Sequence, residues 1–136
     1  MMLTDSLRKK SGFTLIEILT TMTIIAVLAG LALVSFQGAR KTARDGKRKA
    51  DLEQIRSALE MYRADNPTIG YPANLSALTG YITLPSDPLP GRSYSYNPIS
   101  TSRYNLCASL EISTGVTYSD CNGNCGTGCN HQVKNP

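Results

Sequence analysis

A single carboxylate, that of Glu17, lies in an otherwise uncharged apolar run from Phe13 to Phe36. This run of 24 residues is long enough to cross a bilayer as a helix, because a helix rises about 1.5 Å per residue and the hydrocarbon core is about 30 Å thick. A carboxylate in lipid is costly unless a cation neutralises it. The residue types therefore predict that Glu17 forms a charge pair with a partner that the apolar run itself does not supply.

The other side chains with chemistry to offer are four cysteines near the C-terminus, Cys107, Cys121, Cys125 and Cys129. In a small domain beyond a membrane segment, such a cluster indicates an oxidising, extracytoplasmic setting and predicts two disulfides. Three connectivities remain open. A zinc site that uses the cysteines or His131 is the weaker alternative, because the C-x3-C-x3-C spacing departs from the usual C-x2-C. Calcium is weaker still, because Asp120 is the only acid in this tail.

No catalytic arrangement is visible in the remaining sequence. The single histidine, His131, lies in a polar tail, and no glycine-rich phosphate loop or nucleophile–base pair can be identified. We therefore expect no enzymatic activity, no cofactor and no resident metal.

A short polar leader, residues 1–12, precedes the apolar run and ends with Arg8, Lys9 and Lys10. It is typical of the basic n-region of a targeting sequence. An ordinary secretory signal fits poorly, because the apolar run exceeds the usual length of about 7–15 residues and no clear A-x-A cleavage site follows it. The sequence therefore disfavours removal of the apolar run as part of an ordinary secretory signal.

The stretch Gly12-Phe13-Thr14-Leu15-Ile16-Glu17, after a basic leader, resembles the processing site of type IV pilins and type II secretion pseudopilins. The resemblance implies that a prepilin peptidase cuts between Gly12 and Phe13 and methylates the new amino terminus of Phe13. It also implies a homo-oligomeric helical filament in which Glu17 neutralises the amine of a neighbouring subunit. Removal of one partner of such a buried pair costs about 3–5 kcal/mol. The alternative is that Glu17 pairs with its own amine or snorkels to the interface.

Residues 37–65 are expected to continue the helix as an amphipathic segment. Apolar residues recur there at spacings of three and four, at Leu52, Ile55, Leu59 and Tyr62. Asn66-Pro67 should end the helix, because the residue before proline is pushed out of the helical region. No proline interrupts residues 13–66, so any kink would have to arise at Gly30, Gly38 or Gly46.

Residues 66–136 are expected to form a small β-rich domain with a cysteine-containing tail. Tyr104, Leu106, Ala108, Leu110 and Ile112 share one parity, which predicts a half-buried strand, and Cys107 would point to the opposite face. A strand at Tyr94 and Tyr96 is expected before it. A hairpin turn at Ser113-Thr114-Gly115 would lead to a third strand at Val116 and Tyr118. The predicted fold class is α+β, with the long helix packed against an antiparallel sheet, as in pilins.

Six basic residues lie between residues 40 and 49: Arg40, Lys41, Arg44, Lys47, Arg48 and Lys49. They are interpreted as a solvated face, or as contacts to acids of neighbouring subunits, with one helical ion pair between Asp45 and Lys49. DNA binding by an assembled filament is a weaker alternative. Their excess over the three basic residues of the leader conflicts with the positive-inside rule. The cysteines and the leader nevertheless favour export of the C-terminal domain.

The function expected from the resemblance is that of a structural subunit of a type IV pilus-like filament. One alternative is a pseudopilin of a type II secretion or DNA-uptake system, and another is an anchored domain that does not polymerise. The expected partners are the prepilin peptidase and N-methyltransferase, a pilus or secretion assembly platform with its ATPase, and the membrane. The precursor is expected in the cytoplasmic membrane as a single-pass protein with its C-terminal domain outside the cytoplasm. The assembled filament would be periplasmic or on the cell surface.

Overall fold

The structure is a computed structural model that describes residues 12–112, 115–121 and 125–135, with only the backbone given for Val34. Its longest element is the helix α1 (Leu15–Asp65). The chain divides into two compact units, Met1–Gly38 and Ala39–Pro136. The first described part of α1 therefore belongs to one unit, and the rest of the helix belongs to the other.

The first unit is a bare apolar helix. Every described side chain in residues 12–38 is exposed, including Phe13 at 85% and Leu31 at 69%. By length and composition, α1 contains a segment that could cross a membrane, and none of this segment is covered by the described residues. Apolar side chains left in water to this extent indicate a surface that is covered in the protein's working environment.

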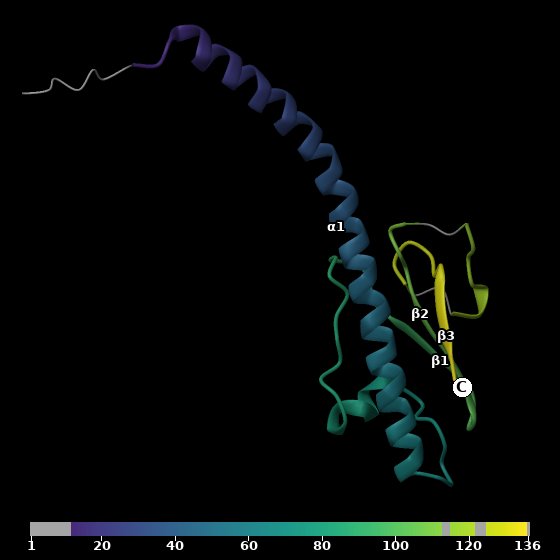
Figure 1. Cartoon of the computed structure of the whole chain (residues 1–136). Coiled ribbons are helices and arrows are strands. Elements are labelled where there is room, and N and C mark those ends of the chain that lie inside the picture. The colour runs from purple at the N-terminus through teal and green to yellow at the C-terminus, as the bar shows by residue number, and fades with distance from the viewer. Residues whose placement is uncertain (1–11, 113–114, 122–124, 136) are drawn as a thin grey trace, which may run out of the picture. The chain divides into compact units, whose positions relative to one another are not determined.

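The second unit is built around the last part of α1 and a three-stranded antiparallel sheet (Figure 1). The strands are β1 (Ser95–Ser100), β2 (Arg103–Ala108) and β3 (His131–Lys134), in the order β1-β2-β3. The helix buries the predicted apolar stripe against β2, because Leu52, Ile55 and Leu59 share one core with Tyr104 and Leu106. The predicted α+β class, a long helix packed on a small antiparallel sheet, is confirmed.

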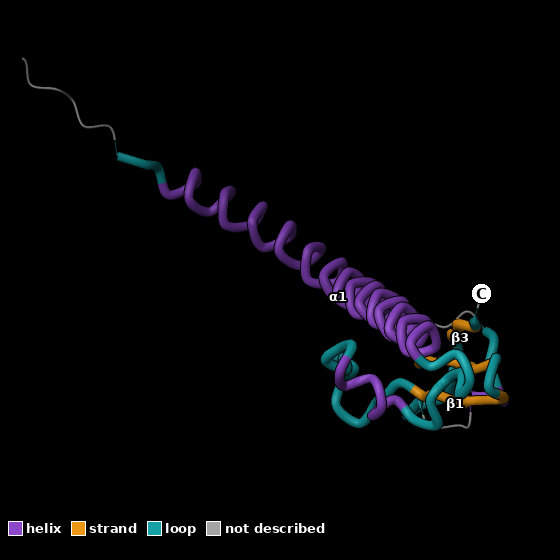
Figure 2. Tube along the Cα trace, turned by 90° about the horizontal axis from the view of Figure 1, so that it is seen from below, coloured by secondary structure: helices purple, strands orange, loops and turns teal. Residues whose placement is uncertain are grey.

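In Figure 1 the middle of the connection from α1 to β1 lies on the other side of this part of the helix from the sheet, and in Figure 2 the connection and the strands both lie below the last turns of α1. It contains the short helix η1 (Leu75–Gly80), which buries Leu78 in the same core. The connection is anchored where the Tyr71 amide donates to the Thr101 carbonyl, at 3.0 Å. Gly70 has a φ of +81°, and a Cβ there would collide with the Thr101 carbonyl, so this close approach requires glycine.

The prediction of a third strand at Val116 and Tyr118 is wrong. The Tyr118 amide donates to the Cys129 carbonyl, at 2.8 Å, and a short helix, η2 (Ser119–Cys121), follows. The third strand is instead β3, which pairs with β2 so that Gln132 lies opposite Cys107. Ser113 and Thr114, which were expected in the hairpin turn, lie outside the described residues.

The strand predicted over residues 104–112 is shorter than its parity suggests, because β2 ends at Ala108. Beyond Ala108 the backbone amides donate to side chains instead of to the backbone of a neighbouring strand. The Leu110 amide donates to Asn130 Oδ1, and the amides of Glu111 and Ile112 donate to the carboxylate of Asp45. Three amides that a longer strand could have paired across the sheet thus find side-chain acceptors.

The outer strands of the sheet are β1 and β3. Strand β1 contains Pro98, and its pairing with β2 becomes irregular between Pro98 and Ser100. Strand β3 is only 4 residues long and ends at the exposed Lys134.

Candidate processing and assembly site

Helix α1 begins with a capping box formed by Thr14 and Glu17. The Thr14 amide and the Thr14 hydroxyl both donate to Glu17 Oε2 at 2.8 Å, and the Glu17 amide donates to Thr14 Oγ1 at 3.4 Å. This reciprocal pattern satisfies backbone donors that the first turn of a helix leaves without partners. It also explains why the helix begins at Leu15 rather than at the predicted Phe13, since Thr14 is the capping residue.

The capping box leaves part of the Glu17 carboxylate available. Both contacts to Thr14 use Oε2, and Glu17 forms no ion pair with any residue that the structure describes. The side chain is exposed on the single chain. The geometry therefore permits Glu17 to cap its own helix with one oxygen while the other accepts a hydrogen bond from an external cation.

Gly12 and Phe13 precede the capping residue Thr14 and lie outside any regular element. A Cβ at Gly12 would meet no heavy atom within 4 Å, so the fold itself places no steric demand for glycine there. The side chain of Phe13 is 85% exposed. The basic leader residues Arg8, Lys9 and Lys10 lie outside the described residues.

A second cluster of charged side chains is buried in the C-terminal unit around Arg48. The Arg48 guanidinium is fully buried and donates to Asp45 at 2.7 Å, to Asp87 in a bidentate pair at 2.7 and 2.9 Å, and to Glu111 at 3.0 Å. Arg44 makes a second bidentate pair with Glu111, at 2.6 and 2.7 Å. One cation thus joins the helix to two segments that are remote in the sequence.

The network shifts the pKa values of its acids. The Arg44 guanidinium, followed by that of Arg48, lowers the pKa of Glu111 to about 2. Burial alone would raise the pKa of Asp87, but hydrogen bonds from Arg48 and from the Leu89 amide outweigh this and leave it below its ordinary value. The hydrogen bonds that Arg48 donates to Asp87 are the main reason that the pKa of Arg48 is raised. All three groups are therefore charged near neutral pH.

These contacts correct the interpretation of the basic cluster at residues 40–49. Arg44 and Arg48 do not belong to a solvated face, and Asp45 pairs with Arg48 rather than with Lys49. The exposed basic residues that remain in this part of α1 are Arg40, Lys41, Lys47 and Lys49.

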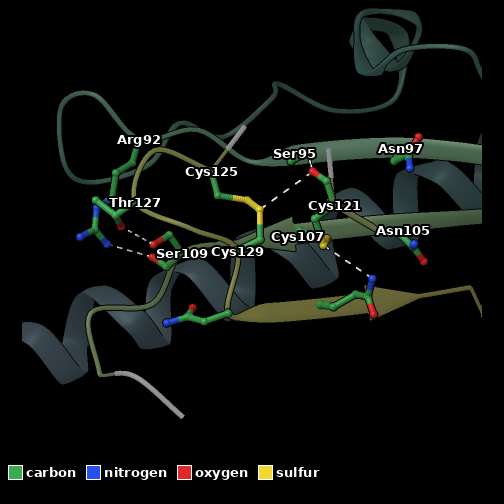
Figure 3. Close-up of a disulfide and its surroundings, with 12 residues drawn as sticks. Arg92, Ser95, Asn97, Asn105, Cys107, Ser109, Cys121, Cys125, Thr127 and Cys129 are labelled. Carbon is green, nitrogen blue, oxygen red and sulfur yellow. Dashed lines mark hydrogen bonds between the residues drawn. A yellow bond between two sulfur atoms is a disulfide. The ribbon is translucent and has the colours of Figure 1, made fainter. Parts of the chain in front are cut away.

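The four cysteines form two disulfides, Cys107–Cys121 and Cys125–Cys129. Figure 3 shows them beside the sheet, with Ser95 donating its hydroxyl to the Cys121 carbonyl. As the parity of β2 predicts, Cys107 lies away from the helix-facing core and in a cluster with the other three cysteines. Because all four are oxidised, none of them offers a thiolate to zinc in this structure.

Sequence reasoning missed two features of the site. The capping box has a readable signal, since Thr14-Leu15-Ile16-Glu17 follows the S/T-x-x-E pattern. The Arg48 network has no such signal, because Asp87 and Glu111 lie 39 and 63 residues from Arg48. Only the fold brings them together.

Comparison with known protein families concerns the segment that contains the capping box. Residues 7–33 match the family model described as the prokaryotic N-terminal methylation motif. This segment contains the capping box and the residues around Gly12 and Phe13.

The chain is also similar to the type II secretion system core protein G of several bacteria. It is 33% identical to the protein from Vibrio cholerae over 84 residues, which are 62% of this chain and 56% of the relative. It is 37% identical to that of Klebsiella michiganensis over 87 residues, or 64% and 60% of the two chains. The match to the Escherichia coli protein is 35% over 89 residues, or 65% and 59%.

The match spans less than two thirds of the length of these relatives. No solved structure matches the chain significantly. Within these bounds, the chain matches the prokaryotic N-terminal methylation motif over residues 7–33 and is similar over part of its length to the type II secretion system core protein G of several bacteria.

Proposed function

We propose that this protein is a structural subunit of a pilin-like filament, of the pseudopilin kind that serves protein secretion. The observation that carries the proposal is the bare apolar helix of residues 15–38, which has a single acid in its first turn. Such a helix is suited to two environments that cover it, first the membrane and then a bundle of identical helices.

Processing creates the partner that Glu17 needs. Cleavage between Gly12 and Phe13 leaves an ammonium group on Phe13, one helical turn before Glu17. The capping box holds Glu17 through Oε2, and the remaining oxygen accepts the amine of a neighbouring subunit. Each added subunit thereby neutralises two charges that would be costly alone in an apolar environment.

The choice between secretion and a surface pilus rests on the relatives. These relatives are core proteins of the type II secretion system, which favours the pseudopilin over the type IV pilus that the resemblance first suggested. The assembly platform with its ATPase and the prepilin peptidase are proposed as partners on the same basis. The C-terminal unit, with two disulfides, is proposed to lie outside the cytoplasm.

Mass spectrometry of the mature protein tests the processing step. The expected mass lacks the 12 leader residues, gains one methyl group on Phe13 and lacks the four hydrogens that two disulfides remove. An intact leader, or a cut beyond residue 36, would contradict the proposal.

Substitutions at Glu17 separate its two roles in assembly. Glu17→Gln keeps a capping box, since glutamine serves there as well as glutamate, but it removes the charge. We expect Glu17→Gln to abolish filaments in an assembly assay by electron microscopy, because loss of one partner of a buried pair costs about 3–5 kcal/mol. Normal filaments with Glu17→Gln but none with Glu17→Ala would show that Glu17 acts as a cap and would overturn the charge pairing.

Thr14→Val is the matched control for the cap. It removes the hydroxyl but leaves the Glu17 charge, and it should cost about 1 kcal/mol of helix stability. Filaments should still form, in smaller amounts. Their complete loss would show that the cap, and not the charge, limits assembly.

A further inference from the structure

The exposed charges in the first turns of the C-terminal unit all have the same sign. Between residues 39 and 52 the exposed charged side chains are Arg40, Lys41, Lys47 and Lys49. Both acids of this stretch are buried and committed elsewhere. Asp45 binds Arg48 and the backbone at Glu111 and Ile112, and Asp51 accepts the hydroxyl of Tyr94 at 2.6 Å.

In the folded unit, Asp45 and Asp51 are buried, so they do not neutralise the exposed basic residues that lie beside them in the sequence. An isolated helix would let Asp45 and Asp51 offset the basic residues by pairing at three and four residues' distance. Because both acids face the core of the unit, the basic side chains are left unneutralised over about 14 Å of helix. This is a polybasic patch made by tertiary structure as well as by composition.

A polar cavity extends the patch. Lys41 lines a cavity of about 410 Å³ together with Arg92, Ser109, Glu111 and Thr127. Glu111 is the one acid in this lining and is ion-paired with Arg44 and Arg48. The two lining cations, Lys41 and Arg92, outnumber it and give the charged lining of this cavity a positive balance. The hydroxyls of Ser109 and Thr127 bond to each other at 2.8 Å and leave one hydroxyl hydrogen to donate. One such donor beside two cations suits a phosphodiester.

We propose that this patch, Arg40, Lys41, Lys47 and Lys49 with the cavity beside Lys41, binds the anionic headgroups of the membrane in which the subunit is anchored before assembly. The position in the chain supports a lipid partner, because Arg40 follows the last residue of the apolar run, Phe36, by only four residues. Each basic residue near an anionic surface contributes about fivefold to its association with that surface. The inference rests on the membrane anchoring in the proposed function, but not on polymerisation.

A second copy of the chain is the competing occupant. The exposed acids of α1 in this unit are Glu53 and Asp65, and Glu60 is half-buried beside the hydroxyl of Tyr71. These are accompanied on the same helix by Arg56 and Arg63, so this later part of the helix offers little net negative charge to a neighbour. Charge complementarity therefore favours headgroups over a second subunit.

Lysine footprinting of the full chain tests the proposal. The protein is loaded at one subunit per lipid nanodisc, either in phosphatidylcholine alone or with one third phosphatidylglycerol, and labelled with an amine-reactive ester. We expect Lys41, Lys47 and Lys49 to react about fivefold more slowly in the anionic discs, and about 1 M salt to abolish the difference. The exposed Lys134 on β3 serves as the internal control.

Paired charge reversals give the matched control. Lys47→Glu with Lys49→Glu should remove the protection of Lys41, whereas Arg103→Glu with Lys134→Glu should leave it unchanged. Equal labelling in both lipids would overturn the proposal. Protection in neutral discs that grows with the number of subunits per disc would overturn it in favour of a second copy. The comparison of the two lipids uses discs with one subunit, which contain no filament, so its result does not depend on the Glu17 experiments.

Discussion

The Arg48 guanidinium is the most deeply buried charge described in the C-terminal unit, with no exposed surface. Its hydrogen bonds reach three carboxylates from three segments. Replacement by a hydrophobic residue would leave these carboxylates buried without their shared cation, and the cost of breaking such an arrangement greatly exceeds that of a surface pair. Arg48 therefore acts as a structural cation for this unit.

We expect Arg48→Met to reduce the free energy of unfolding of the C-terminal unit by about 3–5 kcal/mol. Arg48→Lys should also be destabilising, because an ammonium group cannot form the bidentate pair with Asp87. The matched control is Lys47→Met, at an exposed neighbouring position, which should change stability by less than about 0.5 kcal/mol. Urea denaturation followed by circular dichroism measures all three, and equal stability of Arg48→Met and Lys47→Met would contradict the role.

The same network predicts how stability depends on pH. The folded-state pKa of Glu111, about 2, lies below its ordinary 4.5, so its contribution is complete above about pH 4.5 and is lost as the pH falls toward 2. Asp87 shifts in the same direction. We expect the denaturation midpoint to fall across this range, and Glu111→Gln to flatten the profile. An unchanged slope in Glu111→Gln would assign the acid sensitivity to other groups.

The elements that a short stretch of sequence determines could be predicted. Asn66-Pro67 ends α1, where the Asn66 amide and side chain both donate to the Tyr62 carbonyl. The alternation from Tyr104 to Ala108 identifies β2 because one face of the strand meets the helix. In both cases the pattern that predicts the element lies within the element or within two residues of its end.

The remaining elements depend on distant partners. Strand β3, with the sequence His-Gln-Val-Lys, has little apolar content and forms because β2 offers it an edge and a disulfide-bonded tail leads to it. The segment at Val116 and Tyr118 has the alternation of a strand, but its backbone is paired to Cys129. Periodicity could not distinguish these two segments, because it carries no information on which edge is available.

The two disulfides should differ in their contribution to the fold. Cys107–Cys121 closes a loop with a sequence separation of 14, whereas that of Cys125–Cys129 is only 4. In the chain-entropy description the longer loop stabilises more, by about 1 kcal/mol, and it also ties the tail to β2. We expect replacement of Cys107 and Cys121 by alanine to be more destabilising than replacement of Cys125 and Cys129, as measured by chemical denaturation. The opposite order would show that the short loop is the one that holds the tail.

At the scale of the whole molecule, the two units suit different surroundings, an apolar one for the first and water for the second. The described exposed apolar surface is concentrated in residues 13–36, whereas residues 39–136 have a core of their own. We propose the domain boundaries on this basis: a leader at 1–12, an apolar helix at 13–36, an amphipathic helix at 37–65 and a β-rich domain at 66–136.

A chain that begins at residue 39 should therefore be a soluble, folded monomer. Light scattering should give the mass of one chain without detergent, and circular dichroism should show a cooperative thermal transition. A matched chain that begins at residue 13 should require detergent or assemble. Aggregation of the shorter chain would show that the apolar helix is needed for folding and not only for anchoring and assembly.

The two edges of the sheet determine whether copies of the domain can pair through their strands at high local concentration. Subunits gathered in a membrane or a filament meet at high local concentration, and exposed strand edges under such conditions recruit one another into β-aggregates. Here one edge contains Pro98 and an irregular pairing, and the other is four residues long and ends in Lys134. Both features discourage strand addition. The domain can thus be concentrated without amyloid-like pairing, which leaves the helices as the surface through which we propose that copies join.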